Sequence, residues 1–170
     1  MTLVKRSSNR YCAFMKNPMA VLLHNIRSAH NVGSIFRTAD AVGVQKIYLS
    51  GYTPTPLDRF GRPHREVGKT ALGAEHTIAW EYHTSPTALI SRLKKKGWQI
   101  VGVEQDARAV DYRTYKMIGS TLFILGNEVR GISKGLRSKC DALVEIPMHG
   151  AKESLNVSVA AGIVLFSVTP

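Results

Sequence analysis

The chain has 170 residues and a mass of 18.7 kDa, and its 44% hydrophobic and 21% charged residues exclude an intrinsically disordered protein. Lysine and arginine outnumber aspartate and glutamate by 23 to 12, which leaves a net charge of +11 and indicates a polyanionic partner such as nucleic acid. A solvated basic surface without a partner is the alternative. The charge is uneven, because residues 1–70 hold 11 basic and 3 acidic side chains and no acid precedes Asp40.

Residues 1–17 are polar and basic without periodicity, which predicts an arm ahead of a single domain over residues 18–170. The apolar run at residues 20–24 predicts a buried strand. Apolar residues then recur at helical spacing, which predicts a helix that Asn31 caps and Gly43 ends.

Residues 51–73 are rich in proline, glycine and basic side chains, which predicts a long loop. Apolar runs on either side of it predict further elements: strands at 46–50, 77–80, 98–104, 121–125 and 142–146, and helices near 87–96, 134–139 and 156–168. This alternation predicts an α/β domain with a largely parallel sheet flanked by helices. Ligands of such sheets bind beyond the carboxyl ends of the strands, so we expect the chemistry just after Leu125 and Ile146.

Several common sites are excluded by spacing. The only cysteines, Cys12 and Cys140, and the six histidines show no metal-binding spacing, so we expect no metal and reduced thiols. No two glycines are two residues apart, which excludes the Rossmann dinucleotide fingerprint, and Pro63 replaces the first glycine of a P-loop ending at Lys69. The longest apolar stretch, residues 157–168, is shorter than the roughly 20 residues that span a bilayer. We expect a cytoplasmic protein without membrane contact.

Two stretches place polar side chains near a predicted helix start and strand end. In residues 31–40 (NVGSIFRTAD), Asn31 and Arg37 would lie on one helix, and a structural cap with a solvated arginine is the alternative. In residues 123–131 (FILGNEVRG), Gly126 would let the strand end bend sharply, and the turn after it would present the carboxylate of Glu128. A plain turn is the alternative for this second stretch.

A third stretch, residues 146–158 (IPMHGAKESLNVS), runs from a strand end through a loop to a helix start. Ser154 or Asn156 would cap that helix, and capping alone explains both residues. The backbone of the loop could offer amides and carbonyls to a ligand without any side-chain signature.

Taken together, in this order and spacing, the three stretches resemble the three motifs of the SpoU (TrmH-type) branch of the SPOUT RNA methyltransferases. The resemblance runs from about Pro18 to the end of the chain. It implies a fold with a deep C-terminal trefoil knot, S-adenosylmethionine as the cofactor, and methyl transfer to a ribose 2′-hydroxyl of tRNA or rRNA. It also implies a homodimer whose RNA site is built from both subunits. We expect tRNA rather than rRNA, because a bare dimer can grip a compact substrate.

The resemblance also assigns roles to residues. Arg37 matches the catalytic arginine, and the polar residues around the reacting hydroxyl match Asn31, Glu128, Ser154 and Asn156. Cofactor contacts match Val103, Gly126, Ile146, Met148, Ser154 and Leu155. Because a guanidinium stays protonated in proteins, we expect Arg37 to stabilise charge, oriented by Glu128 or Asn156, rather than to act as a base.

Phosphate recognition requires positive charge without fixed spacing, so basic residues of the loop and the arm are candidate RNA contacts: Arg59, Arg62, Arg65, Lys69, Lys5 and Arg6. A noncatalytic basic RNA-binding module would satisfy the charge equally well. The set of motif residues favours the enzyme.

Overall fold

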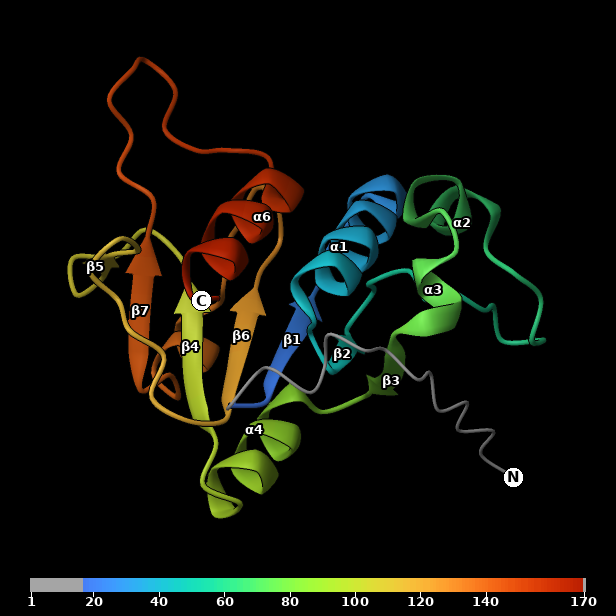
Figure 1. Cartoon of the computed structure of the whole chain (residues 1–170), viewed down its shortest axis with the longest axis horizontal. Coiled ribbons are helices and arrows are strands. Elements are labelled where there is room, and N and C mark those ends of the chain that lie inside the picture. The colour runs from blue at the N-terminus through green and yellow to red at the C-terminus, as the bar shows by residue number, and fades with distance from the viewer. Residues whose placement is uncertain (1–16, 170) are drawn as a thin grey trace.

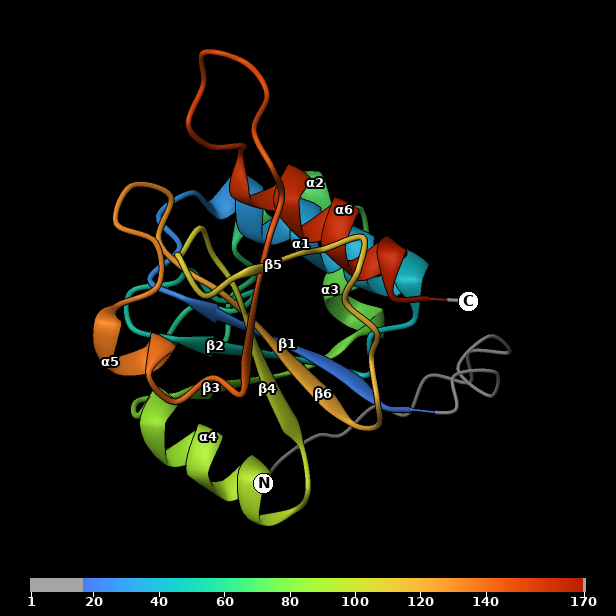
Figure 2. The same cartoon turned by 90° about the vertical axis from the view of Figure 1, so that its left-hand side faces the viewer.

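The computed structural model describes residues 17–169, which form a seven-stranded sheet covered by helices on both faces (Figures 1 and 2). The strand order is β3-β2-β1-β6-β4-β7-β5, and all neighbours run parallel. Parallel neighbours need long crossovers, most of which contain a helix here, whereas the β4–β6 connection contains only β5. The predicted α/β fold with a parallel sheet is confirmed. Of the predicted arm, residues 1–16 lie outside the described part of the chain.

The chain forms its elements in the following order: β1 (Met19–His24), α1 (Ala29–Val42), β2 (Lys46–Ser50), α2 (Arg65–Ala71), α3 (Ala74–Thr77), β3 (Ala79–His83), α4 (Pro86–Lys95), β4 (Gln99–Val103), β5 (Val110–Asp111), β6 (Thr121–Leu125), α5 (Lys134–Arg137), β7 (Ala142–Glu145) and α6 (Val157–Ser167). None of these helices combines the length and the apolar character needed to span a membrane, within residues 17–169.

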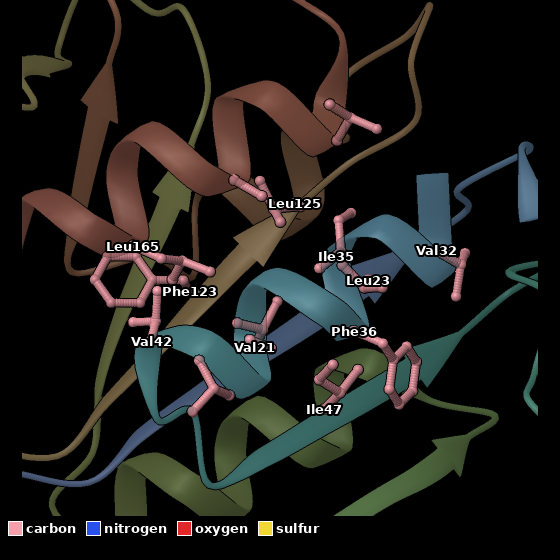
Figure 3. Packing of buried hydrophobic residues seen from close by; sticks show 14 of the residues in the cluster. Val21, Leu23, Val32, Ile35, Phe36, Val42, Ile47, Phe123, Leu125 and Leu165 are labelled. Atoms are coloured by element: carbon pink, nitrogen blue, oxygen red, sulfur yellow. The ribbon is translucent and has the colours of Figure 1, made fainter. Parts of the chain in front are cut away.

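The central strands are buried on both faces, so their alternating side chains enter two separate cores. Val21 and Leu23 of β1 contribute to the core under α1, α2 and α6, whereas Ala20 and Leu22 contribute to the core under α4 and α5. Figure 3 shows the first core, in which Phe36 of α1 lies over β2 beside Ile47. This double burial explains why the strands read as continuous apolar runs.

Helix α1 begins earlier than its sequence predicts. Ser28 is the N-cap, and its hydroxyl accepts a hydrogen bond from the amide of Asn31 at 3.2 Å. The prediction that Asn31 caps the helix was therefore wrong, and its amide side chain remains available for other partners. Gly43 ends the helix in the left-handed region at φ 86°, as predicted.

The predicted loop over residues 51–73 was wrong in its second half, where α2 forms and α3 follows. Helices this short are marginal by themselves, so tertiary packing must stabilise them. Gly33 of α1 provides the close contact, because a Cβ there would lie 2.2 Å from the carbonyl oxygen of Val67. The hydroxyl of Thr70 also donates to the carbonyl of His30 at 2.9 Å. Residue pairs this far apart in sequence leave no local signal.

The close approach at Gly33 predicts that Gly33→Ala destabilises the protein, because α2 must move away from α1. We expect a loss of about 1–3 kcal/mol in the free energy of unfolding, measured by urea denaturation. Gly135→Ala in α5 is the matched control, since a Cβ there meets nothing within 4 Å. An unchanged midpoint in Gly33→Ala would contradict the packing described.

Two smaller differences concern the edges of the sheet. The strand predicted at 77–80 begins only at Ala79, because Thr77 ends α3. The two-residue strand β5 was not predicted, and it forms only through its pairing with β7. The remaining helices and strands match their predicted positions to within two residues at each end.

Candidate active site

A cavity of about 290 Å³ opens beyond the carboxyl ends of β4, β6 and β7, beside the first turn of α6. In a parallel sheet these ends meet at one edge, which is where ligands of such folds bind. All six residues that the family resemblance assigns to the cofactor line this cavity: Val103, Gly126, Ile146, Met148, Ser154 and Leu155. Three segments that are distant in sequence therefore form one site.

Gly126 allows two backbone segments to touch at the wall of the cavity. A Cβ at this position would lie 2.4 Å from the carbonyl carbon of Gly131 and 2.5 Å from the amide nitrogen of Ile132. The carboxylate of Glu104, at the end of β4, accepts a hydrogen bond from that same amide. The close approach is therefore the reason for a glycine here. An unusual backbone angle is not, since the φ of Gly126 lies outside the left-handed region. A larger residue would separate the turn after β6 from β4.

Glu128 joins the turn after β6 to the start of α1. Its carboxylate accepts hydrogen bonds from the amides of Arg27 at 2.9 Å and Ser28 at 3.1 Å, and from Asn31 Nδ2 at 3.0 Å. Burial raises the pKa of Glu128, but these hydrogen bonds outweigh burial and lower its pKa below the ordinary value. The carboxylate is therefore charged at neutral pH, in the position that the helix dipole favours.

Asn31 is hydrogen-bonded in turn to Asn156 of the third motif (residues 146–158). Its side-chain oxygen accepts a hydrogen bond from Asn156 Nδ2 at 3.1 Å, while Asn156 Oδ1 caps α6 by accepting from the amide of Ser158 at 2.9 Å. A chain of hydrogen bonds thus runs from Glu128 through Asn31 to Asn156. It links three helix or strand ends that are up to 125 residues apart in sequence.

Arg37 lies apart from this chain of hydrogen bonds. Its exposed side chain lines a second hollow, with Leu72, Thr77 and neighbouring residues between α1 and the α2–α3 segment. Glu128 and Asn156, expected to orient the guanidinium, bind Asn31 instead. Within one chain the other assigned residues either line the cavity or are joined to it through the hydrogen bonds of Glu128, whereas Arg37 does neither.

The cavity is acidic, which the sequence reasoning did not anticipate. Glu104, Glu145 and Glu153 line it together with Glu128, and its lining residues include no lysine or arginine. Glu104 ends the strand predicted at 98–104, and Glu145 is one residue from the end of the strand predicted at 142–146, so their position near a strand end was the available signal. A carboxylate-lined cavity in a chain of net charge +11 favours a ligand group that is positively charged.

The predicted RNA contacts lie elsewhere. Arg59, Arg62, Arg65 and Lys69 are all exposed on the segment from the loop after β2 into α2. The other predicted contacts, Lys5 and Arg6, lie outside the described residues. In residues 17–169, no cluster of three histidine, cysteine, aspartate or glutamate side chains could hold a metal ion.

The model of the SpoU rRNA methylase family matches residues 18–166. The chain belongs to this family. A family relative from Neisseria meningitidis, 23S rRNA (guanosine-2′-O-)-methyltransferase RlmB, is 35% identical over 87% of this chain and 56% of its own length. The SpoU chain thus spans little more than half the length of such curated relatives.

Solved structures agree with this membership. The A. aeolicus TrmH/SpoU tRNA modifying enzyme superimposes with a TM-score of 0.78 at 29% identity, over 89% of this chain and 74% of that one. An AdoMet-bound rRNA methyltransferase from Sinorhizobium meliloti superimposes with a TM-score of 0.78 at 31% identity, over 90% and 56% of the two chains.

Proposed function

We propose that this SpoU family member transfers a methyl group from S-adenosylmethionine to a ribose 2′-hydroxyl of RNA. The observation that carries the proposal is the acidic cavity, which is lined by the assigned cofactor residues and joined through Glu128 to Asn31 and Asn156. The relatives named above support the activity, and the AdoMet-bound neighbour supports the cofactor.

The residues of the cavity fit this cofactor chemically. Apolar side chains such as Val103, Ile146 and Leu155 suit an adenine ring, while the glutamates suit the positive charges of the sulfonium and the amino group. The cofactor supplies a methyl group on a sulfonium centre. The role proposed for Ser154 and Asn156 is to surround the reacting ribose hydroxyl from the start of α6.

Arg37 takes the electrostatic role in this proposal. An arginine is always protonated in proteins, so it holds a phosphate of the substrate and stabilises the charge that develops on the hydroxyl oxygen. Asn31 and Glu128 hold the N-terminal turn of α1 in place and thereby position the helix that carries Arg37.

We also propose a homodimer in which Arg37 of one subunit serves the cavity of the other. Arg37 lines a separate hollow of its own chain, and α6 exposes Val159 (49%) and Phe166 (54%) beside α1. Exposed apolar side chains on a nearly all-apolar helix favour a protein partner.

Phe166→Glu is expected to convert the dimer to monomers, because it places a charge in the buried interface. Sedimentation velocity measures the mass, and methyl transfer should fall with the dimer. Ile118→Glu, at a residue that is 83% exposed and belongs to the β5–β6 connection rather than to α6, is the matched control. A dimer that persists in Phe166→Glu would contradict this interface.

Further parts of the proposal concern substrate, location and topology. The relative from Neisseria meningitidis is named for 23S rRNA, so we propose rRNA as the substrate in place of the tRNA expected from sequence, and the cytoplasm as the location. We propose the same division of the chain as the sequence analysis, into an arm over 1–17 and a domain over 18–170.

We also propose that the chain forms the trefoil knot, which is supported by the return of the chain from β7 past the β4–β6 connection to α6 beside α1 (Figure 2). Stretching the chain from both ends should then leave a tight knot and an extension shorter than the full chain length.

Calorimetric titration with S-adenosylmethionine tests the enzyme against the noncatalytic RNA-binding module. The wild type should release heat on binding, and Met148→Arg should abolish it, because the new cation enters the acidic cavity and repels the sulfonium. Ile118→Arg adds the same charge outside the cavity and should bind normally. The absence of binding by the wild-type protein would favour the RNA-binding module.

A further inference from the structure

The loop before α2 contains a compact turn that holds an aromatic ring in solvent. Leu57 and Pro63 form an isolated antiparallel bridge, and the Asp58 carboxylate accepts hydrogen bonds from the amides of Phe60 at 2.8 Å and Arg62 at 2.9 Å. The amide of Asp58 donates in return to the carbonyl of Arg62 at 2.8 Å. This turn is therefore pre-shaped, and it leaves the Phe60 side chain 66% exposed.

Two guanidinium groups lie close to the Phe60 ring. The central carbons of Arg59 and Arg62 lie 4.7 Å and 5.0 Å from the ring centroid. Arg62 is anchored, because its Nε donates to the Asp58 carboxylate at 2.8 Å. Arg59 forms no hydrogen bond or ion pair with any residue in 17–169. Arg59 can thus leave the ring at little cost, since an exposed cation–π contact contributes only about 0.5–1 kcal/mol.

The loop that carries the turn starts at the same edge of the sheet as the cavity. This loop follows the carboxyl end of β2, and Asn127 of the turn after β6 donates to the Tyr52 hydroxyl at 2.9 Å at the start of that loop. In Figure 1 the loop projects beside α2 and α3, at the end of the molecule away from β7. The exposed Arg65 and Lys69 of α2 follow it in the chain.

This combination selects one class of ligand. Positive charge alone would suit any phosphate backbone, but an exposed ring close to guanidinium groups suits a nucleobase with a free face. In a duplex the base faces are already stacked, so an aromatic platform discriminates in favour of unpaired segments.

We propose that the turn over residues 57–63 is a stacking site for an unpaired RNA base, with Phe60 as the platform and Arg59 moving aside to a neighbouring phosphate. Arg62 keeps its orientation through its hydrogen bond to Asp58. The proposal deepens the proposed function, on which it rests only for the identity of the RNA as the methylation substrate.

The test compares Phe60→Leu with Phe60→Trp in the full chain. The probes are a short single-stranded RNA carrying 2-aminopurine and the fully paired duplex of the same sequence, both without cofactor. Phe60→Leu should weaken single-strand binding by about tenfold and remove the quenching of 2-aminopurine, whereas Phe60→Trp should retain both. Duplex binding should be unchanged in both variants, because it depends on the basic side chains. Circular dichroism and thermal melting should show that both variants fold like the wild type, because the Phe60 side chain is exposed.

Three outcomes would overturn the stacking site: no loss in Phe60→Leu, an equal loss for duplex and single strand, or no rescue by tryptophan. Each of these outcomes would mean that the turn binds RNA only through its phosphates. Failure of the proposed function would be seen in a different measurement, as the absence of S-adenosylmethionine binding by the wild-type protein. The stacking site is tested separately, because binding of the single-stranded probe is measured without the cofactor.

Discussion

Arg37→Ala is expected to lower methyl transfer by at least about a hundredfold while leaving S-adenosylmethionine binding unchanged. The guanidinium does not line the cavity of its own chain, so its removal takes away charge stabilisation but no cofactor contact. Arg37→Lys should also be inactive, because a lysine lacks the planar fork that holds two oxygens at once. Methylation of RNA with labelled cofactor, together with calorimetric titration, measures both quantities.

Arg92→Ala is the matched control for this loss, since Arg92 is an exposed arginine on α4, on the opposite face of the sheet. Mixing Arg37→Ala with a cofactor-site variant such as Met148→Arg offers a sharper test. If Arg37 serves the partner's cavity, mixed dimers should recover part of the activity that neither variant has alone. Near-normal turnover by Arg37→Ala would refute the assignment.

Glu128→Gln is expected to lower the free energy of unfolding by about 1–3 kcal/mol at neutral pH and to reduce methyl transfer sharply. Two backbone amides and the Asn31 side chain donate to this carboxylate, and a glutamine turns a donor group toward some of them. The start of α1 then loosens, and Arg37 moves with the helix. Denaturation with urea measures the stability, and Glu153→Gln, at an exposed glutamate of the same cavity, is the control for the stability alone.

The contribution of Glu128 should depend on pH. In the folded protein the pKa of Glu128 lies below its ordinary value, because its hydrogen bonds outweigh the opposing effect of burial, so the unfolded chain binds the proton more readily. The stabilisation is therefore complete above the unfolded pKa and is lost as the pH falls through the folded pKa. The difference between wild type and Glu128→Gln should be largest near neutral pH and should shrink in acid. A difference independent of pH would contradict a charged Glu128.

Local patterns were sufficient for most of the secondary structure. The β1 run and Gly43 at the end of α1 each act over a few residues, so their sequence signals predict them directly. The sequence left the cap of α6 open between Ser154 and Asn156, and the structure shows that it is Asn156. The start of α1 was mispredicted because Ser28 and Asn31 are both good caps and only the fold chooses between them. Helix α2 was missed because its stability depends on contact with Gly33 of another helix.

The sequence by itself determined the fold class and which side chains belong to the family motifs, since apolar periodicity and motif spacing are written in adjacent residues. Only the tertiary structure decided how those side chains meet. Glu128 reaches Asn31 across 97 positions, and Asn31 reaches Asn156 across 125, because the parallel sheet brings distant strand and helix ends to one edge. The same folding directs Arg37 into a separate hollow, which no local pattern could indicate, because the direction of an exposed side chain depends on how its helix packs.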